Sequence, residues 1–136
     1  MSKPVYLAHN PTSVWQVPEG FKPVYSHAAE TSGATRQLFV SGQFGVAPDG
    51  ALAVDFAPQC EQAMDNVEAL LHVAGMTINN VVKLTYYVTR AADFPALLEI
   101  RRRRWAREPA PSVTALVVAA LARPDYRIEI EAVAAA

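Results

Sequence analysis

The sequence predicts an α+β fold in which two helices cover one face of a sheet. Two segments, near 58–74 and 93–105, have the apolar spacing of amphipathic helices, and they alternate with segments rich in β-branched and aromatic residues. Strands before and after a helix-strand-helix unit are typical of two βαβ-type units that share one sheet. A chain of 136 residues is long enough to form one domain with a buried core.

The N-terminal part is expected to contain an arm followed by a hairpin. Residues 1–22 hold recurrent prolines without an apolar period, which indicates an irregular arm. Strands are predicted at 24–29 and 37–41, and the Ser32-Gly33 turn signal between them makes a hairpin the simplest interpretation. A further turn is predicted at 47–50, because Asp49-Gly50 tolerates the positive φ of tight turns.

The first helix is the clearest element of the sequence. It is predicted to begin near Pro58, since proline suits the first turn, and to end before Gly75, since glycine suits the position after a C-terminus. Its apolar residues are spaced by four and three and predict one buried stripe, formed by Cys60, Met64, Val67, Leu71 and Ala74.

The rest of the chain predicts a strand, a second helix and two more strands. Residues 81–88 are too rich in β-branched and aromatic residues for a surface helix. Asp93 can cap the second helix, which Pro109 and Pro111 end, and strands follow at 113–121 and 127–134. The inner stripe of this helix is expected to consist of Phe94, Leu97, Leu98 and Trp105. Because both helices lie on one face, the other face is expected to be covered by further copies of the chain.

The last strand carries a pair of carboxylates at alternate positions. Side chains alternate between the faces of a strand, so Ile128 and Ile130 share one face while Glu129 and Glu131 share the other. The two glutamates therefore mark either a solvated sheet face or a functional site.

The composition excludes several classes of protein. A net charge of −1 gives no overall field that favours nucleic acid or an acidic membrane, and no apolar run approaches the roughly 20 residues that span a bilayer. The single cysteine, Cys60, cannot form an intrachain disulfide, and nothing near Met1 resembles a signal peptide, so a cytoplasmic location is expected.

Neither a metal site nor a thiolate nucleophile is expected. The spacing of His9, His27 and His72 does not match that of metal ligands. Cys60 lies on an apolar helix stripe, where cysteine is normally an inert small hydrophobic residue.

Four consecutive arginines, 101–104, leave three interpretations open. A solvated helix face, with Arg101 or Arg104 flanking the apolar stripe, is favoured, because four consecutive residues span more than one turn and cannot all face one ligand. An RNA-binding patch is the second, although Glu99 and Glu108 lie nearby. In the third, one arginine reaches a cleft between subunits and binds a substrate carboxylate.

Several short strings, taken in order, resemble the RidA (YjgF) family over the chain from about residue 24 to the end. The strings are FVSGQ at 39–43, QAMDNV at 62–67, AG at 74–75, VKLT at 82–85, DF at 93–94 and IEIEAVA at 128–134. The resemblance implies a chorismate-mutase-like protomer with two helices and six strands, in one domain spanning 1–136. It also implies a homotrimer whose sheets form an inner barrel, with small-molecule clefts between subunits and without metal or organic cofactor.

The activity that the resemblance implies is hydrolysis of reactive enamines and imines to a 2-oxo acid and ammonia. Carried over by position, Glu129 would position the attacking water. Tyr25, Ser41 and Gly42 would contact the substrate.

The chain departs from the family where the substrate carboxylate is bound. Aligned from Leu121, the family's Pro-Ala-Arg-Ser run falls on 111–114, so Val113 stands where the family has its arginine. A different gapping pairs Pro-Ala with Pro109-Ala110 and puts Pro111 there instead, and neither alignment restores an arginine. The neighbouring cleft positions are Thr114, Ala115, which replaces a cysteine, and Leu98, which replaces an asparagine. These changes predict a more apolar cleft, a substrate other than 2-aminoacrylate that is larger or uncharged, and a raised pKa of Glu129.

Three functions follow as hypotheses. The first is a hydrolase of a reactive imine, enamine or related unstable metabolite, and the second is a trimeric small-molecule-binding protein without catalysis. Ribonuclease activity ranks lowest, because the sequence offers no set of nucleophile and general base and nucleic acid is not an expected partner.

Overall fold

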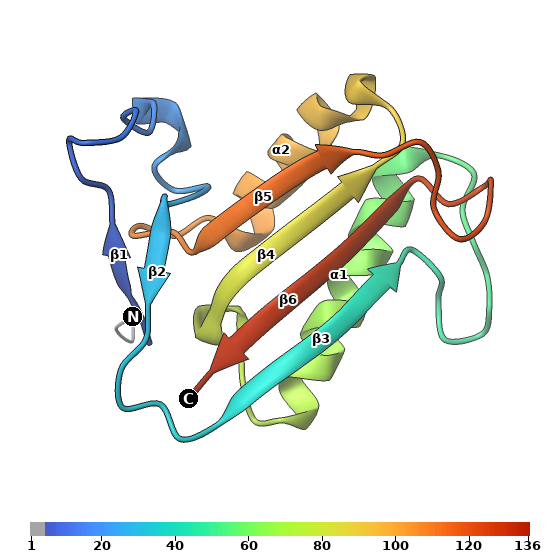
Figure 1. Ribbon diagram of the computed structural model, residues 1–136. Coiled ribbons are helices and arrows are strands. Elements are labelled where there is room, and N and C mark those ends of the chain that lie inside the picture. Colours follow the sequence, from blue (N-terminus) through green and yellow to red (C-terminus); the bar gives the residue numbers. More distant parts are fainter. Residues whose placement is uncertain (1–4) are drawn as a thin grey trace.

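The structure is a computed structural model that describes residues 5–136. Figure 1 shows a sheet with both helices on one face, while the other face stays open. The strands of the main sheet, in the order β3-β6-β4-β5, are β3 (Gln37–Phe44), β4 (Val81–Val88), β5 (Ser112–Val117) and β6 (Ile128–Ala135). The helices are α1 (Phe56–Val73) and α2 (Phe94–Trp105). The predicted α+β class, with two helices on one face, is confirmed.

The strand β6 lies in the middle of this sheet. It pairs antiparallel with β3 on one side and with β4 on the other, whereas β4 and β5 are parallel neighbours. The helix α2 therefore connects two adjacent parallel strands, and α1 connects two parallel strands with β6 inserted between them. This is the predicted pair of βαβ-type units.

The predicted hairpin between 24–29 and 37–41 is wrong. The short strand β2 (Ala28–Glu30) pairs with β1 (Leu7–His9), and β3 pairs with β6. The sequence signal failed because β1 and β2 have three residues each, too few for a recognisable period. The arm residues 1–4, with Pro4, lie outside the described part of the chain.

The core lies between the sheet and the two helices. On α1, the residues Cys60, Met64, Val67 and Leu71 are completely buried, as the predicted stripe requires. On β6, Ile128 and Ile130 are also completely buried, and the glutamates that alternate with them lie on the open face. The helix α1 ends as predicted, since Gly75 has a φ of +71° and Met76 donates to the carbonyl of Leu71.

Some boundaries differ from the sequence prediction. The strand β5 ends at Val117 instead of 121, and the alanine-rich residues that follow lie in a loop. Among residues 5–136, no helix combines the length and the apolar composition that crossing a bilayer requires.

The arginine run holds α2 to its neighbours. Arg104 donates to the main-chain oxygen and the carboxylate of Glu61, to Asp65 at 2.7 Å and to Glu68, all on α1. Burial alone would lower the pKa of Arg104, but these carboxylates outweigh it and raise the pKa. Arg104 is therefore not part of a solvated face, and the sequence predicts Arg101 or Arg104 beside the apolar stripe.

The other arginines divide between exposed and buried positions. Arg103 pairs with Glu61 but keeps about half of its side chain exposed. Arg102 donates to the carbonyl of Gly20 in the arm at 2.8 Å and lies over the ring of Phe21. Arg101 is almost completely buried. The run thus ties α2 both to α1 and to the arm.

We predict that Arg104→Ala lowers the free energy of unfolding by about 1–2 kcal/mol, because it removes a largely buried partner of several carboxylates that are themselves half exposed. Arg103→Ala is the matched control and should change it by about 0–1 kcal/mol. Urea denaturation measures both. Equal effects of the two substitutions would contradict the assignment of Arg104 as the main link between the helices.

Candidate functional site

A largely apolar cavity of about 540 Å³ lies between α2, β5 and the arm. The end of the arm and the residues that follow it contribute Phe21, Val24 and Tyr25, and β5 contributes Val113 and Ala115. The wall is completed by α2 and β4, with Phe94, Pro95, Leu97, Leu98, Arg101 and Tyr86. Its volume lies in the range of pockets that bind small organic molecules.

The cavity brings together four of the predicted site residues. Tyr25, Leu98, Val113 and Ala115 all line it, although they come from three different parts of the chain. Because Val113 and Ala115 alternate with Thr114 along β5, their side chains point toward α2. Leu98, Val113 and Ala115 therefore belong to one apolar wall.

The carboxylate of Glu129 lies on the open face of the sheet, against the main chain of Gly42. A Cβ atom built on Gly42 would overlap Oε1 of Glu129, so only glycine leaves room for this carboxylate. The pairing of β3 with β6 shifts by one residue here, and Ser41 and Gly42 together face Glu131 in a β-bulge. The bulge thus brings three predicted site residues, Ser41, Gly42 and Glu129, to one place.

The electrostatics around Glu129 favour its protonated form more than usual. Partial burial and, secondly, the charge of Glu131 raise the pKa of Glu129 above its ordinary value. Tyr87, opposite Glu129 on β4, donates a hydrogen bond to Glu131, and this bond raises the pKa of Tyr87. Glu131 therefore accepts a hydrogen bond from Tyr87, and its negative charge disfavours ionisation of Glu129.

Thr114 lies apart from the cavity. Its hydroxyl accepts a hydrogen bond of 2.8 Å from Nζ of Lys83, which itself lies near the middle of the open face. Although the resemblance places Thr114 in the cleft with Val113, the alternation of β5 directs the two side chains to opposite faces.

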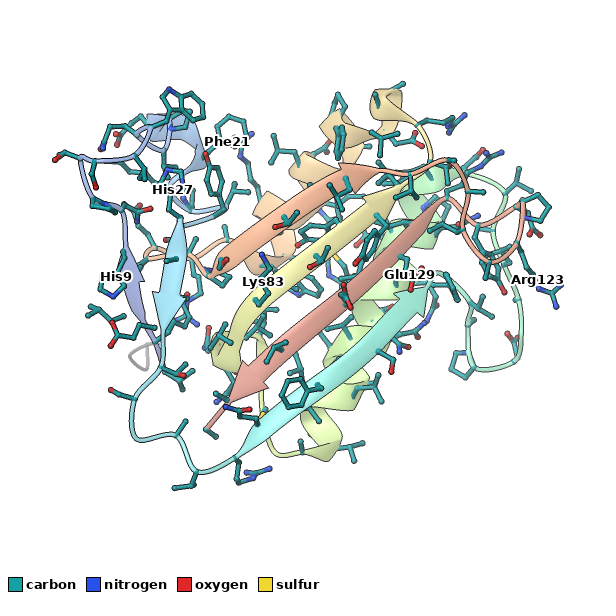
Figure 2. The ribbon with its side chains drawn as sticks, viewed as in Figure 1. His9, Phe21, His27, Lys83, Arg123 and Glu129 are labelled. Carbon is teal, nitrogen blue, oxygen red and sulfur yellow. The ribbon has the colours of Figure 1, made fainter. Side chains whose placement is uncertain are left out.

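One chain does not bring all the predicted site residues together. Figure 2 shows Glu129 and Lys83 on the face that the helices leave open, whereas Phe21 of the cavity wall lies in the arm, on the β5 side of the sheet. The strand β4 separates β5 from β6, and the cavity lies on the helix side of the sheet. Within one chain, the cavity and Glu129 are thus two separate half-sites.

Two further residues of the cavity wall are Tyr86, which the sequence analysis missed, and Arg101, which it did not single out from the run of four arginines. Leu97, Arg101 and Trp105 are spaced by four, so the period of α2 places Arg101 on its buried side. The run of four arginines hid this signal, because charge alone favoured a solvated position. Cys60 lies in the core, and burial raises the pKa of its thiol to about 12, so it carries no thiolate near neutral pH.

Comparison with known protein families shows to which family this chain belongs. A family model described as Endoribonuclease L-PSP matches residues 21–136. The chain belongs to this family. It is the RidA (YjgF) family that the sequence strings indicated.

Individual members of the RidA family are similar over most of the chain. TdcF of Escherichia coli, named as a candidate reactive intermediate deaminase, is 31% identical over 100 residues, which cover 71% of this chain and 77% of that protein. The crystal structure of TdcF with bound serine has a TM-score of 0.69 at 28% identity and covers 82% of this chain and 87% of its own.

A second solved structure matches nearly the whole fold. The Rid-family protein YyfB from Yersinia pestis, described as of unknown function, has a TM-score of 0.80 at 31% identity, over 97% of this chain and 99% of its own. The chorismate-mutase-like RidA protomer expected from the sequence is therefore confirmed.

We predict that Glu131→Gln lowers the pKa of Glu129, because it removes the nearby negative charge that disfavours ionisation of Glu129. A carboxyl-detected NMR titration measures the shift. The control is Glu30→Gln, a change in the short sheet with β1 that should leave the Glu129 titration in place. If Glu131→Gln left that titration unchanged, the coupling of the two acids would be excluded.

Proposed function

We propose that this RidA-family chain hydrolyses a reactive imine or enamine to a carbonyl compound and ammonia. The observation that carries the proposal is the Glu129 carboxylate, half-buried, with a raised pKa and resting on Gly42. The similarity to TdcF, named as a candidate reactive intermediate deaminase, supports the same class of reaction. The substrate is not 2-aminoacrylate but a molecule with a larger apolar part, because an apolar wall replaces the family's polar contacts.

The proposed reaction needs one water and one base. The Glu129 carboxylate accepts a proton from water as the water oxygen attacks the electrophilic carbon of the C=N bond. The same acid then returns the proton to nitrogen, which gives a carbinolamine. Glu129 next takes the proton of the carbinolamine hydroxyl and passes it to nitrogen, so that the C–N bond breaks, the carbonyl forms and ammonia leaves. A raised pKa suits this exchange, since it brings the acid closer to neutral pH.

A single substrate reaches both half-sites only if two copies of the chain meet. The cavity and Glu129 lie on opposite faces of the sheet, and a small imine cannot extend through a sheet to touch both. The open face also exposes apolar side chains, with Phe39 at 71% and Leu116 at 43%. Both observations support self-association in which the cavity of one copy faces Glu129 of the next, and the resemblance to the RidA family makes a homotrimer the assembly that we propose.

The second candidate is a binding protein with the same cleft but no turnover. It is favoured by the replacement of the family arginine by Val113. Without this arginine, a charge-assisted hydrogen bond to the substrate carboxylate is lost, and a carboxylate substrate binds more weakly. Ribonuclease activity has less support, since Arg102, Arg103 and Arg104 are engaged by Gly20 and by carboxylates of α1.

We predict that Glu129→Gln lowers the rate of imine hydrolysis by about 100-fold or more, because the amide cannot accept the proton of water. The assay generates imines from apolar amino acids with an amino-acid oxidase and follows the release of ammonia. Gly42→Ala should also lower the rate, since the new methyl group displaces the Glu129 carboxylate, while the thermal unfolding temperature changes little.

The matched control for Gly42→Ala is Gly20→Ala. A Cβ atom at Gly20 meets only Nη2 of Arg102, at 3.9 Å, so this variant should keep the wild-type rate. If wild type and Glu129→Gln both give the uncatalysed rate across apolar and polar imines, the hydrolase proposal fails and the binding protein is left.

We further predict that two inactive variants complement each other when they are combined. Leu98→Trp fills the cavity and Glu129→Gln disables the acid, so neither homo-oligomer is active. In random mixed oligomers, about a quarter of the shared sites join an intact cavity to an intact Glu129, and a corresponding fraction of the activity returns. Recovery is measured after co-expression, and its absence would place both parts of the site in one chain.

A further inference from the structure

A buried charge beside the cavity is not neutralised by any carboxylate of residues 5–136. Arg101 lines the cavity and is 1% exposed. Its Nη1 donates to the carbonyl of Trp105 and its Nη2 to the carbonyl of Val24, at 2.9 Å. Within residues 5–136 no carboxylate pairs with it, and its Nε has no hydrogen-bond acceptor.

The contrast with Arg104 shows that this arrangement is unusual for the helix. Arg104 lies three residues later and is surrounded by carboxylates of α1. Arg101 has only two main-chain carbonyls, and desolvation lowers its pKa. Charged groups taken out of water are normally paired, because main-chain dipoles offset only part of the lost hydration. An anion from outside the chain would supply the missing partner.

A second donor borders the same cavity. The hydroxyl of Tyr86 on β4 is buried and has no partner among the described residues, and Tyr86 also lines the cavity. A carboxylate has two oxygens that accept hydrogen bonds, so it can satisfy a guanidinium N–H and a hydroxyl together. The remaining wall is apolar and fits a hydrocarbon tail.

We propose that the cavity binds a carboxylate with an apolar tail, and that Arg101 on α2 replaces the arginine which the family pattern places at Val113 on β5. The resemblance assigns no role to the Arg101 position. In the proposed reaction the ligand is a 2-imino acid with a large apolar side chain. That identification rests on the proposed function, whereas the carboxylate binding does not.

The main chain at Val24 has to move when this ligand binds. Because Arg101 is covered, an incoming carboxylate takes the place of the Val24 carbonyl on the guanidinium. Phe21 and Tyr25, which also line the cavity, then form part of the wall around the tail. Binding is therefore expected to slow or speed hydrogen exchange of the amides around Val24, and a change in either direction reports the contact.

The test compares two probes of the same shape, 3-phenylpropanoate and its uncharged amide, by calorimetric titration of the full-length protein. The wild type should bind the carboxylate about 10- to 100-fold more tightly than the amide. Propanoate, which lacks the ring, should bind more weakly than 3-phenylpropanoate, since it leaves the apolar wall unfilled.

Three variants assign the effect to Arg101. Arg101→Met should remove the preference for the carboxylate, and Arg103→Met, on the same helix but half exposed, should keep it. Adding Val113→Arg to Arg101→Met should restore the preference from β5. The wild-type comparison does not depend on the folding of any variant.

Equal binding of acid and amide by the wild type overturns the proposal, and so does the absence of binding by both. A folded Arg101→Met variant that keeps the preference overturns it as well. Failure of the proposed function gives a different result. If the protein binds the carboxylate as predicted but imines hydrolyse at the uncatalysed rate, the hydrolase proposal fails and the carboxylate-binding proposal stands.

Discussion

The antiparallel pairing of β6 with both β3 and β4 is the constraint on which the rest of this structure depends. It places the C-terminal strand in the centre of the sheet, so that one of its faces forms the core and the other stays accessible. Ile128 and Ile130 join the two helices to the sheet, and Glu129 points away from them. A shift of this pairing by one residue would exchange the two faces, burying the acids and exposing the isoleucines. Fold and candidate site therefore depend on the same register.

Much of the fold could be predicted because its main elements carry strong periodic signals. The helix α1 has its stripe, its terminal glycine and its first-turn proline, and β4 and β6 have clear strand composition. The failures concern elements whose pairing is decided at long range. The strands β1 and β2 are too short to show a period, and β3 pairs with residues 85 to 98 positions away in the sequence, from Phe44↔Glu129 to Gln37↔Ala135, which local patterns cannot predict.

The candidate site could be predicted only in part, for a related reason. Glu129 was visible from alternation and from family strings, and Tyr25, Leu98, Val113 and Ala115 do share a cavity. The sequence could not show that this cavity and Glu129 belong to different faces of one chain. It also could not show which of the four arginines are buried and which are exposed, because tertiary packing against α1 and the arm decides this. Charge identifies an arginine as polar, but only the fold decides whether it meets carboxylates, solvent or an apolar cavity.

The bulge at Ser41 and Gly42 has a consequence for how this chain can change in evolution. The extra residue sets which way the end of β3 faces, so a deletion there would turn Gln43 and Phe44 over and draw the main chain away from the Glu129 carboxylate. Side chains around the cavity can be exchanged one at a time, and each exchange alters which molecule fits. The number of residues between Val40 and Phe44 has no such freedom. Selection can thus diversify ligands on this scaffold through composition, while the length of β3 stays fixed.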